Sequence, residues 1–449
     1  MRRYVTIAVA TLLIGACSSN PGSTSPPASN PASNTASQTN SPTVAPSVPA
    51  QLAELTEYRS TVGRDPASAS SVQQMQQVVA ADGAFAVTLY RELAQGSQSD
   101  VFFSPYSIST ALSMVLAGAR GKTADQIAEA LGASDPAVWH PARNLLASNL
   151  TEQMPTGMDG QAQPMTLQTT NAIFGQSGYP FEQPFLDLLA RDYGAGLEAV
   201  DFAQKAEEAR QAINTWVAQQ TVNRIRELLA QGSVDDMTRA VLVNTIYFKA
   251  NWIWQFDPKA TTDNDFHPLD GSTVSVPTMH VEHKVDYATG DGWAAVSLPY
   301  WGASMLVIVP DQGKFAQVER SIDPTFVANL DSSLSEYDVT LSFPKWSTDD
   351  SIDLVPPLQS LGISDLFDDF SDLSGISTAE LLYVSHAVHE ADISVDEQGT
   401  EAAAATATVA EATSRGASAT LTVDRPFIYL IRDQNTNEIV FMGRVMDPS

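Results

Sequence analysis

The first half of the chain has apolar residues at helical spacing. Over residues 72–93 they recur every three or four positions, which predicts an amphipathic helix. Ser104 and Pro105 are typical of a helix start, because the hydroxyl can bond a free backbone amide and proline's fixed φ suits the first turn. We therefore expect further helices over residues 104–117 and 213–229.

The second half of the chain has the pattern of β-strands. A continuous apolar run at Ala240–Phe248 fits a strand that is buried on both faces. Further strands are predicted at Val101–Phe103, Trp293–Pro310, Tyr337–Phe343, Phe427–Ile431 and Ile439–Met442, the last two as a hairpin. Helices dominate the first half and strands the second, so the pattern predicts an α+β fold.

Side-chain parity changes near the C-terminal end of this strand-rich half. At positions 389–395 the odd residues are mostly apolar and the even ones polar, as in a half-buried strand. Beyond Gly399 the even positions carry no charge, and the charges of Glu401 and Glu411 fall on odd positions. Four consecutive alanines add little volume, so this segment could enter a sheet without burying an ion. The same window also suits an Ala-rich surface helix or a flexible loop.

Composition and charge narrow the classes of partner. The chain has 449 residues, 43% of them hydrophobic, which is typical of a soluble globular protein with a sizeable core. With 24 basic and 52 acidic residues the formal charge is −28, a field that repels nucleic acid and disfavours attachment to anionic lipid through a basic patch. We expect a monomer that binds no nucleic acid.

The N-terminus has the pattern of an export signal. Two arginines precede an apolar run, and the following Leu13–Cys17 resembles the bacterial lipobox, in which the cut precedes a cysteine that becomes lipidated. Cys17 is the only cysteine, so a disulfide within the chain is excluded. We expect a lipoprotein signal peptide at 1–16 and a disordered Ser/Pro/Asn/Thr-rich tether at 17–70. The protein would then be exported and lipid-anchored to a bacterial membrane, facing the periplasm or the cell exterior. An ordinary secretory signal is the alternative.

Several motifs in a fixed order resemble the serpin family, the serine protease inhibitors, over nearly all of the chain from Val72 onward. They lie at Val101–Leu112, Gly118–Thr123, Ile213–Val217, Val243–Trp252, Glu397–Thr406, Asp424–Phe427 and Phe441–Val445. The resemblance implies a serpin domain over 71–449 with three β-sheets, about nine helices and an exposed reactive-centre loop. It also implies inhibition by loop insertion, an established example of strand addition: a serine protease cleaves the loop and is trapped as an acyl-enzyme while the loop enters the central sheet.

The resemblance assigns residues to the hinge and to the reactive bond of this loop. The hinge comprises Glu397, Gly399, Thr400, Ala402, Ala403, Ala404 and Ala405. The usual family spacing puts the scissile bond at Thr413-Ser414, which suits elastase-like or subtilisin-like proteases with small primary pockets. A loop two residues longer would place it at Arg415-Gly416, which suits trypsin-like proteases with an acidic pocket.

Two further regions of the central sheet are implied by the resemblance. Ser104, Ser107, Asn244 and His389 match the family's polar shutter cluster, in which hydroxyls, an amide and an imidazole can hold two strands together and re-pair when they separate. Trp252 matches a tryptophan of the breach, near the entry point of the loop. The alternatives are ordinary helix caps and core hydrogen bonds for the cluster, and a simple core aromatic for the tryptophan.

Other functions find little support in the sequence. We expect no enzyme activity, because the chain has no GxSxG nucleophile elbow and no sequence signal for a base near Ser104. We expect no cofactor and no metal site, since His280 and His283 would point to opposite faces of a strand. The rival hypotheses are a non-inhibitory serpin-fold carrier and a surface-tethered binding lipoprotein.

Overall fold

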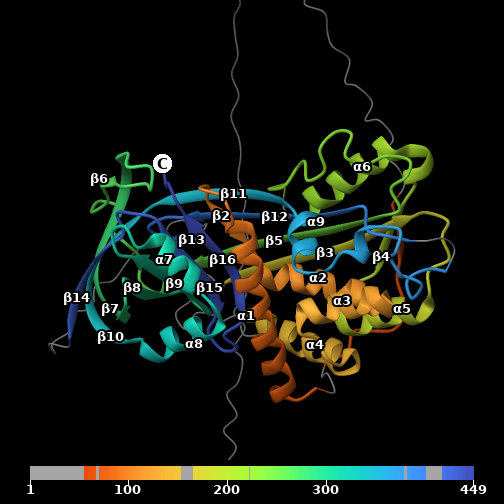
Figure 1. The fold of residues 1–449 in the computed structure, drawn as a ribbon, viewed down its shortest axis with the longest axis horizontal. Coiled ribbons are helices and arrows are strands. Elements are labelled where there is room, and N and C mark those ends of the chain that lie inside the picture. Colours follow the sequence, from red (N-terminus) through yellow and green to blue (C-terminus); the bar gives the residue numbers. More distant parts are fainter. Residues whose placement is uncertain (1–54, 67–69, 153–164, 222, 379–381, 401–416) are drawn as a thin grey trace, which may run out of the picture. The chain divides into compact units, whose positions relative to one another are not determined.

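A computed structural model of the chain describes residues 55–66, 70–152, 165–221, 223–378, 382–400 and 417–449 (Figure 1). Several predicted features lie outside these residues. They are the signal peptide at 1–16, Cys17, most of the tether, the hinge residues Ala402, Ala403, Ala404 and Ala405, and both candidate reactive bonds, Thr413-Ser414 and Arg415-Gly416.

Nine α-helices and two short helical turns form within the described residues. The helices are α1 (Val72–Ala94), α2 (Pro105–Gly118), α3 (Gly121–Leu131), α4 (Pro136–Glu152), α5 (Gln183–Leu188), α6 (Phe202–Gln220), α7 (Phe315–Ser321), α8 (Pro324–Ser333) and α9 (Val355–Ser360), and the turns are η1 (Leu189–Tyr193) and η2 (Asp365–Phe367). Ser71 opens α1 with a capping box to Gln74, and the Ser104 hydroxyl caps α2 as its sequence predicts. In the part of the chain that the structure describes, no helix is long and apolar enough to cross a membrane.

The third predicted helix differs from the structure in its limits. We expected helix over 213–229, whereas α6 begins after the cap residue Asp201 and ends at Gln220. The chain then turns, with Asn223 in the left-handed region at a φ of 61°. The apolar residues after the turn still face the protein, because the Asn214 side chain bonds both backbone groups of Leu229.

The central sheet has seven strands. Their order is β1 (Thr56–Tyr58), β4 (Leu197–Val200), β3 (Thr166–Gln176), β5 (Ala240–Asn251), β13 (Gly399–Thr400), β12 (His386–Val395) and β11 (Trp346–Asp353). Strand β1 corrects our tether boundary, because part of the segment 17–70 that we expected to be disordered pairs antiparallel with β4. The folded body therefore begins upstream of residue 71.

The remaining strands form one continuous sheet where we expected two. Its order is β14 (Ser418–Thr422), β10 (Ser335–Pro344), β7 (Val274–Gly290), β8 (Trp293–Pro299), β9 (Ala303–Pro310), β15 (Phe427–Asp433), β16 (Ile439–Val445) and β2 (Val101–Phe103), with β6 (Thr262–Phe266) paired to β7. The 17-residue strand β7 is the reason, because its first five residues pair with β6, its last five with β8, and its middle with β10. Hydrogen bonding thus joins the three expected sheets into two.

Helices lie on both sides of the central sheet (Figure 1). Helices α1 to α4 pack on one side, around residues such as Phe85 and Leu112. Helix α6 covers the other side of β3 and β5, where Trp216 meets Phe174 edge to face with ring centroids 5.3 Å apart. Full burial of a side chain such as Phe174 stabilises the fold by about 1.5–3 kcal/mol.

Candidate functional site

The strands β5 and β12 pair with each other along part of their length, and beyond that part β13 separates them. They lie parallel and pair from Val241–His386 to Ile246–Ala391. Beyond this paired stretch β13 lies between them, antiparallel to both, with Thr400 opposite Ala250 on β5 and Val395 on β12. We call this junction of β5, β12 and β13 the fork.

The hinge enters the fork through a tight turn. After β12 the chain reverses at Asp396–Gln398, where the amide of Asp396 donates to the carbonyl of Gly399 at 2.9 Å. The Asp396 carboxylate also accepts the amide of Gln398 at 2.8 Å. The return of the chain as a strand, with Thr400 on the buried face, agrees with the parity of the sequence.

Gly399 fits the fork because it has no side chain. Its φ is +149°, and a β-carbon at this position would collide with the carbonyl oxygen of Ala250 and come within 2.8 Å of the Asn251 α-carbon. The close approach lets β13 pair with β5 on one side and β12 on the other.

Thr400 is fully buried at the centre of the fork. Its hydroxyl lies 2.8 Å from the hydroxyl of Tyr300, which is also fully buried. Burial raises the pKa of the Tyr300 hydroxyl far above its ordinary value, although the hydrogen bond with Thr400 acts in the opposite direction. The phenol therefore stays neutral and can share a hydrogen bond with the threonine.

Glu397 anchors the turn to the second sheet. Its carboxylate accepts hydrogen bonds from the Lys345 ammonium at 2.9 Å and from the Thr261 hydroxyl at 2.7 Å. Its backbone carbonyl accepts a hydrogen bond from the amide of Phe256. Burial alone would raise the pKa of Glu397, but the Thr261 hydroxyl and the Lys345 ammonium outweigh it and hold the pKa below its ordinary value. The carboxylate is thus ionised at neutral pH and fixes the start of the hinge.

Trp252 lines the fork, where the sequence placed the breach. Its ring stacks on Tyr300 with centroids 4.1 Å apart and an interplanar angle of 10°. Its indole N–H donates to the carbonyl of Asp396 at 3.0 Å, and its amide donates to the carbonyl of Gln398 at the same distance. The tryptophan is therefore a contact of the hinge turn as well as a core aromatic.

The four predicted shutter residues meet beneath the paired stretch of β5 and β12. The amide of Ser104 donates to His389 Nε2 at 3.0 Å, and the other ring nitrogen bonds the side-chain oxygen of Asn244. The Asn244 amide group donates to the hydroxyl of Ser107 and to the side-chain oxygen of Asn171. A side-chain hydrogen bond thus crosses from β5 to β12 at the pair Asn244–His389.

These contacts fix the state of the imidazole. Because the Ser104 amide needs an acceptor, Nε2 carries no hydrogen, so Nδ1 carries it and donates to Asn244. Burial lowers the pKa of His389 to about 3, with the hydrogen bond to Asn244 acting weakly in the other direction. The cluster is neutral throughout the physiological range.

Asn171 completes the cluster and was missed by our sequence reasoning. It lies on β3 directly opposite Asn244, and it also accepts from the Ser107 hydroxyl at 3.3 Å. The segment Thr166–Gln176 has no alternating pattern strong enough to predict its buried face, so a lone asparagine there carried no signal.

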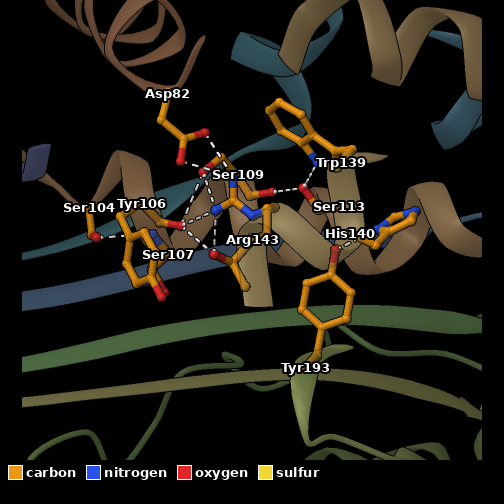
Figure 2. A network of polar contacts seen from close by, with 11 residues as sticks. Asp82, Ser104, Tyr106, Ser107, Ser109, Ser113, Trp139, His140, Arg143 and Tyr193 are labelled. Carbon is orange, nitrogen blue, oxygen red and sulfur yellow. Dashed lines mark hydrogen bonds and ion pairs between the residues drawn. The ribbon is translucent and has the colours of Figure 1, made fainter. Parts of the chain in front are cut away.

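A second buried polar network lies among the helices, and the sequence did not predict it (Figure 2). Arg143 on α4 donates to both carboxylate oxygens of Asp82 on α1, at 2.8 and 2.9 Å. It also donates to the hydroxyls of Ser109 and Thr110 on α2. Figure 2 shows Asp82 and Ser109 beside the Arg143 guanidinium, which cross-links α1, α2 and α4.

Glu438 lies beside this network, between β15 and β16. It is fully buried, and burial together with the charge of Asp82 raises its pKa well above the ordinary value. We conclude that the Glu438 carboxyl holds a proton at neutral pH, while Arg143 compensates the negative charge of Asp82.

The two histidines of the His280-x-x-His283 motif have separate neighbours. His280 bonds the hydroxyls of Thr262 and Ser342, at 2.9 and 3.0 Å. His283 instead stacks on Trp254 with ring centroids 4.7 Å apart. Each imidazole is thus accounted for by its own local contacts.

Comparisons with known proteins agree with this architecture. A family model described as Serpin (serine protease inhibitor) matches residues 80–448. A serpin-like protein of Thermococcus kodakarensis is 38% identical over 84% of this chain and 87% of its own length. Leukocyte elastase inhibitor of Bos taurus is 36% identical over 83% of this chain and all of its own length.

Solved structures share the fold as well. Thyroxine-binding globulin in complex with thyroxine is similar with a TM-score of 0.73 and 29% identity, over 83% of this chain and 99% of that one. Native tengpin, a thermophilic serpin, has a TM-score of 0.77 at 23% identity, over 88% of this chain and all of its own, and supports the fold alone.

Proposed function

The chain belongs to the serpin family, and from this membership we propose that it is a suicide-substrate inhibitor of serine proteases. A target protease would cleave the reactive-centre loop and form an acyl-enzyme with it. The hinge would then continue into the central sheet and carry the protease with it before the ester is hydrolysed. Each molecule would be consumed once, so the protein would not act as an enzyme.

The observation that carries this proposal is the register of β13 in the fork. Thr400 lies opposite Ala250 and Val395, so each further residue of an antiparallel insert would lie opposite the preceding residue on β5 and on β12. Continued in this way, the register would bring Thr406 between Asn244 and His389. Its hydroxyl would then re-pair the side chains whose hydrogen bond the insertion separates.

The same register supports the assignment of the small hinge residues. Ala402 and Ala404 would face the core on the side of Thr400, while Glu401 would face outward. A non-inhibitory carrier is the second candidate, because a protein solved in complex with thyroxine shares this fold. The seated Thr400 and the uncharged inward positions favour inhibition over that candidate.

We place the target among proteases with small primary pockets, elastase-like or subtilisin-like, with Thr413-Ser414 as the reactive bond. The Leukocyte elastase inhibitor relatives support this class, and Arg415-Gly416 with a trypsin-like target is the alternative.

We also propose that Cys17 is lipidated and anchors the exported protein to a bacterial membrane. Replacing Cys17 with Ala should then leave the protein unanchored, as fractionation of membranes would measure.

The proposal is tested by incubating the protein with elastase, subtilisin and trypsin and separating the products in SDS. We expect a covalent complex with at least one protease, and mass spectrometry of the released C-terminal peptide should give a new N-terminus at Ser414. A protease with a blocked active-site serine is the control and should give no complex.

A matched variant sharpens this test. Thr400→Arg would bring a charge to the buried face of the fork, so we expect the loop to be cleaved without trapping. Cleavage of the wild-type loop by every protease with no complex formed would rule out inhibition of these classes and favour the carrier.

A further inference from the structure

The hydroxyl pair formed by Tyr300 and Thr400 is a specific contact between the body of the protein and its hinge. Tyr300 follows β8 and forms an isolated bridge with Trp252, which directly follows β5, so it ties the end of β8 to the end of β5. Among the described residues, its hydroxyl bonds only the hydroxyl of Thr400. The contact therefore joins the hinge to the body of the protein where the two sheets meet.

The aromatic ring of Tyr300 is held in place on two sides. Trp252 stacks on one face at 4.1 Å, and Phe248 meets the ring edge to face at 5.7 Å. Because neither neighbour belongs to the hinge, the tyrosine cannot follow the loop if the loop slips. Its hydroxyl is a fixed point in the fork.

Because the Tyr300 hydroxyl is fixed, it distinguishes the observed pairing register of the hinge from a register shifted by one residue. A slip of one residue would bring either Gly399, which has no hydroxyl, or Glu401, which has a carboxylate, to the Tyr300 hydroxyl. With Gly399 at this position the buried phenol would have no partner, and with Glu401 a charge would be buried in an aromatic pocket. Both states are unfavourable. The slip would also turn the small even residues outward, since strand side chains alternate.

We infer that Tyr300 is a positioning residue that sets the register in which the hinge enters the central sheet. This inference rests on the proposed inhibition and adds to it the residue that selects the correct first pair. The contact acts after cleavage, when insertion competes with hydrolysis of the acyl-enzyme. It leaves recognition of the reactive bond unaffected, because Tyr300 is fully buried at the fork.

The inference is tested with Tyr300→Phe and Thr400→Val, each of which removes one hydroxyl while keeping the shape of the side chain. Two quantities are measured. The first is the stoichiometry, the number of inhibitor molecules consumed for each protease inactivated. The second is the rate constant of complex formation, corrected for this stoichiometry. We expect each variant to raise the partition ratio, the number of inhibitor molecules cleaved as substrate for each one that traps a protease, by roughly three- to tenfold, the rate equivalent of one uncharged hydrogen bond. The double variant should be no worse than either single one, because both remove the same bond.

Two further variants separate positioning from a general loss of structure. Thr400→Ser keeps the hydroxyl and should behave as the wild type does. Tyr287→Phe removes a tyrosine hydroxyl on β7, away from the fork, and should change neither readout. Wild-type stoichiometry in both Tyr300→Phe and Thr400→Val would overturn the inference.

Amide hydrogen exchange of the uncleaved protein tests the contact without any protease. In Tyr300→Phe we expect exchange at residues 396–400 to accelerate severalfold, while exchange of the core strands stays unchanged. If the wild type traps no protease, the proposed function fails, and this measurement still decides whether Tyr300 holds the hinge. Unaltered exchange at these residues would refute the role of Tyr300.

Discussion

His389 keeps a neutral imidazole between the two strands that the proposed insertion would separate. Its pKa of about 3 lies far below the ordinary 6.5, because burial disfavours the cation. Below pH 6.5 the unfolded chain binds a proton at this residue that the folded chain does not bind. The free energy of unfolding should therefore fall as the pH drops from about 6.5 towards 3.

Replacing His389 with Gln isolates this contribution. The amide can still accept from Ser104 and donate to Asn244, so we expect a loss of only about 1–2 kcal/mol at pH 7. The difference from wild type should shrink between pH 6.5 and 4.5, because the variant has no imidazole to protonate on unfolding. Denaturant unfolding at several pH values measures this. His140, with a pKa lowered to about 4, leaves a residual slope of the same sign in both proteins.

Glu438 gives the opposite dependence on pH. The folded chain keeps its proton above pH 4.5, where the unfolded chain releases it, so the free energy of unfolding falls as the pH rises. We expect Glu438→Gln to be more stable than the wild type at pH 8, with the advantage vanishing near pH 4. Asp82→Asn is the contrasting variant and should lose about 3–5 kcal/mol, because it leaves the Arg143 charge buried and uncompensated. Equal effects of the two substitutions at pH 8 would contradict a protonated Glu438.

Strand β1 and the residues directly after it tie the edge of the central sheet to the helices beside it. Ser60 bonds the carboxylate of Asp187 on α5, and Arg64 donates to Asn144 on α4 at 2.8 Å. Tyr58 packs edge to face on Phe181, with ring centroids 5.0 Å apart.

Tyr58→Ala should therefore loosen this strand. We expect faster amide exchange over residues 56–65 and a loss of about 1–2 kcal/mol in the local opening free energy, with the core strands unaffected. Val62→Ala, at an exposed position in the same segment, is the control and should leave exchange unchanged. Equal exchange in both variants would argue that the Tyr58 ring contributes nothing to holding β1.

The strand β1 also shows where prediction from sequence ends. Helices α1 and α2 were predictable because their caps and apolar periodicity agree. The three largely polar residues of β1 carry no such pattern, and β1 forms only because β4 offers it a free edge.

The same limit applies at the candidate site. The hinge parity and the family motifs located Thr400, Trp252 and the shutter, whereas Asn171 and Tyr300 enter through tertiary contacts that no local pattern encodes.

For the whole molecule, the proposed mechanism requires that the intact chain is less stable than the cleaved one. The paired stretch of β5 and β12 holds six residue pairs that insertion would replace with two antiparallel ladders. We therefore expect cleavage within residues 410–416 to raise the melting temperature sharply, by well over the roughly 2–4 °C that a 1 kcal/mol change produces even in a smaller domain of about 150–250 residues.

Calorimetry of the intact and the cleaved protein measures this difference. Thr400→Arg serves as the control, because its cleaved loop should stay outside the sheet and its melting temperature should remain near that of its intact form. An unchanged melting temperature after cleavage of the wild-type loop would speak for the carrier.

Gly399 leads to a consequence for sequence variation. Because a neighbouring carbonyl oxygen occupies the space of a β-carbon there, every missense codon should disturb the fork, whatever its polarity or size. A saturation library sorted for protease trapping should deplete all substitutions at this codon, while the exposed Gln312 codon tolerates most of them. Gly399 should therefore be the position of the hinge turn that tolerates the fewest substitutions, since even the smallest side chain is excluded there.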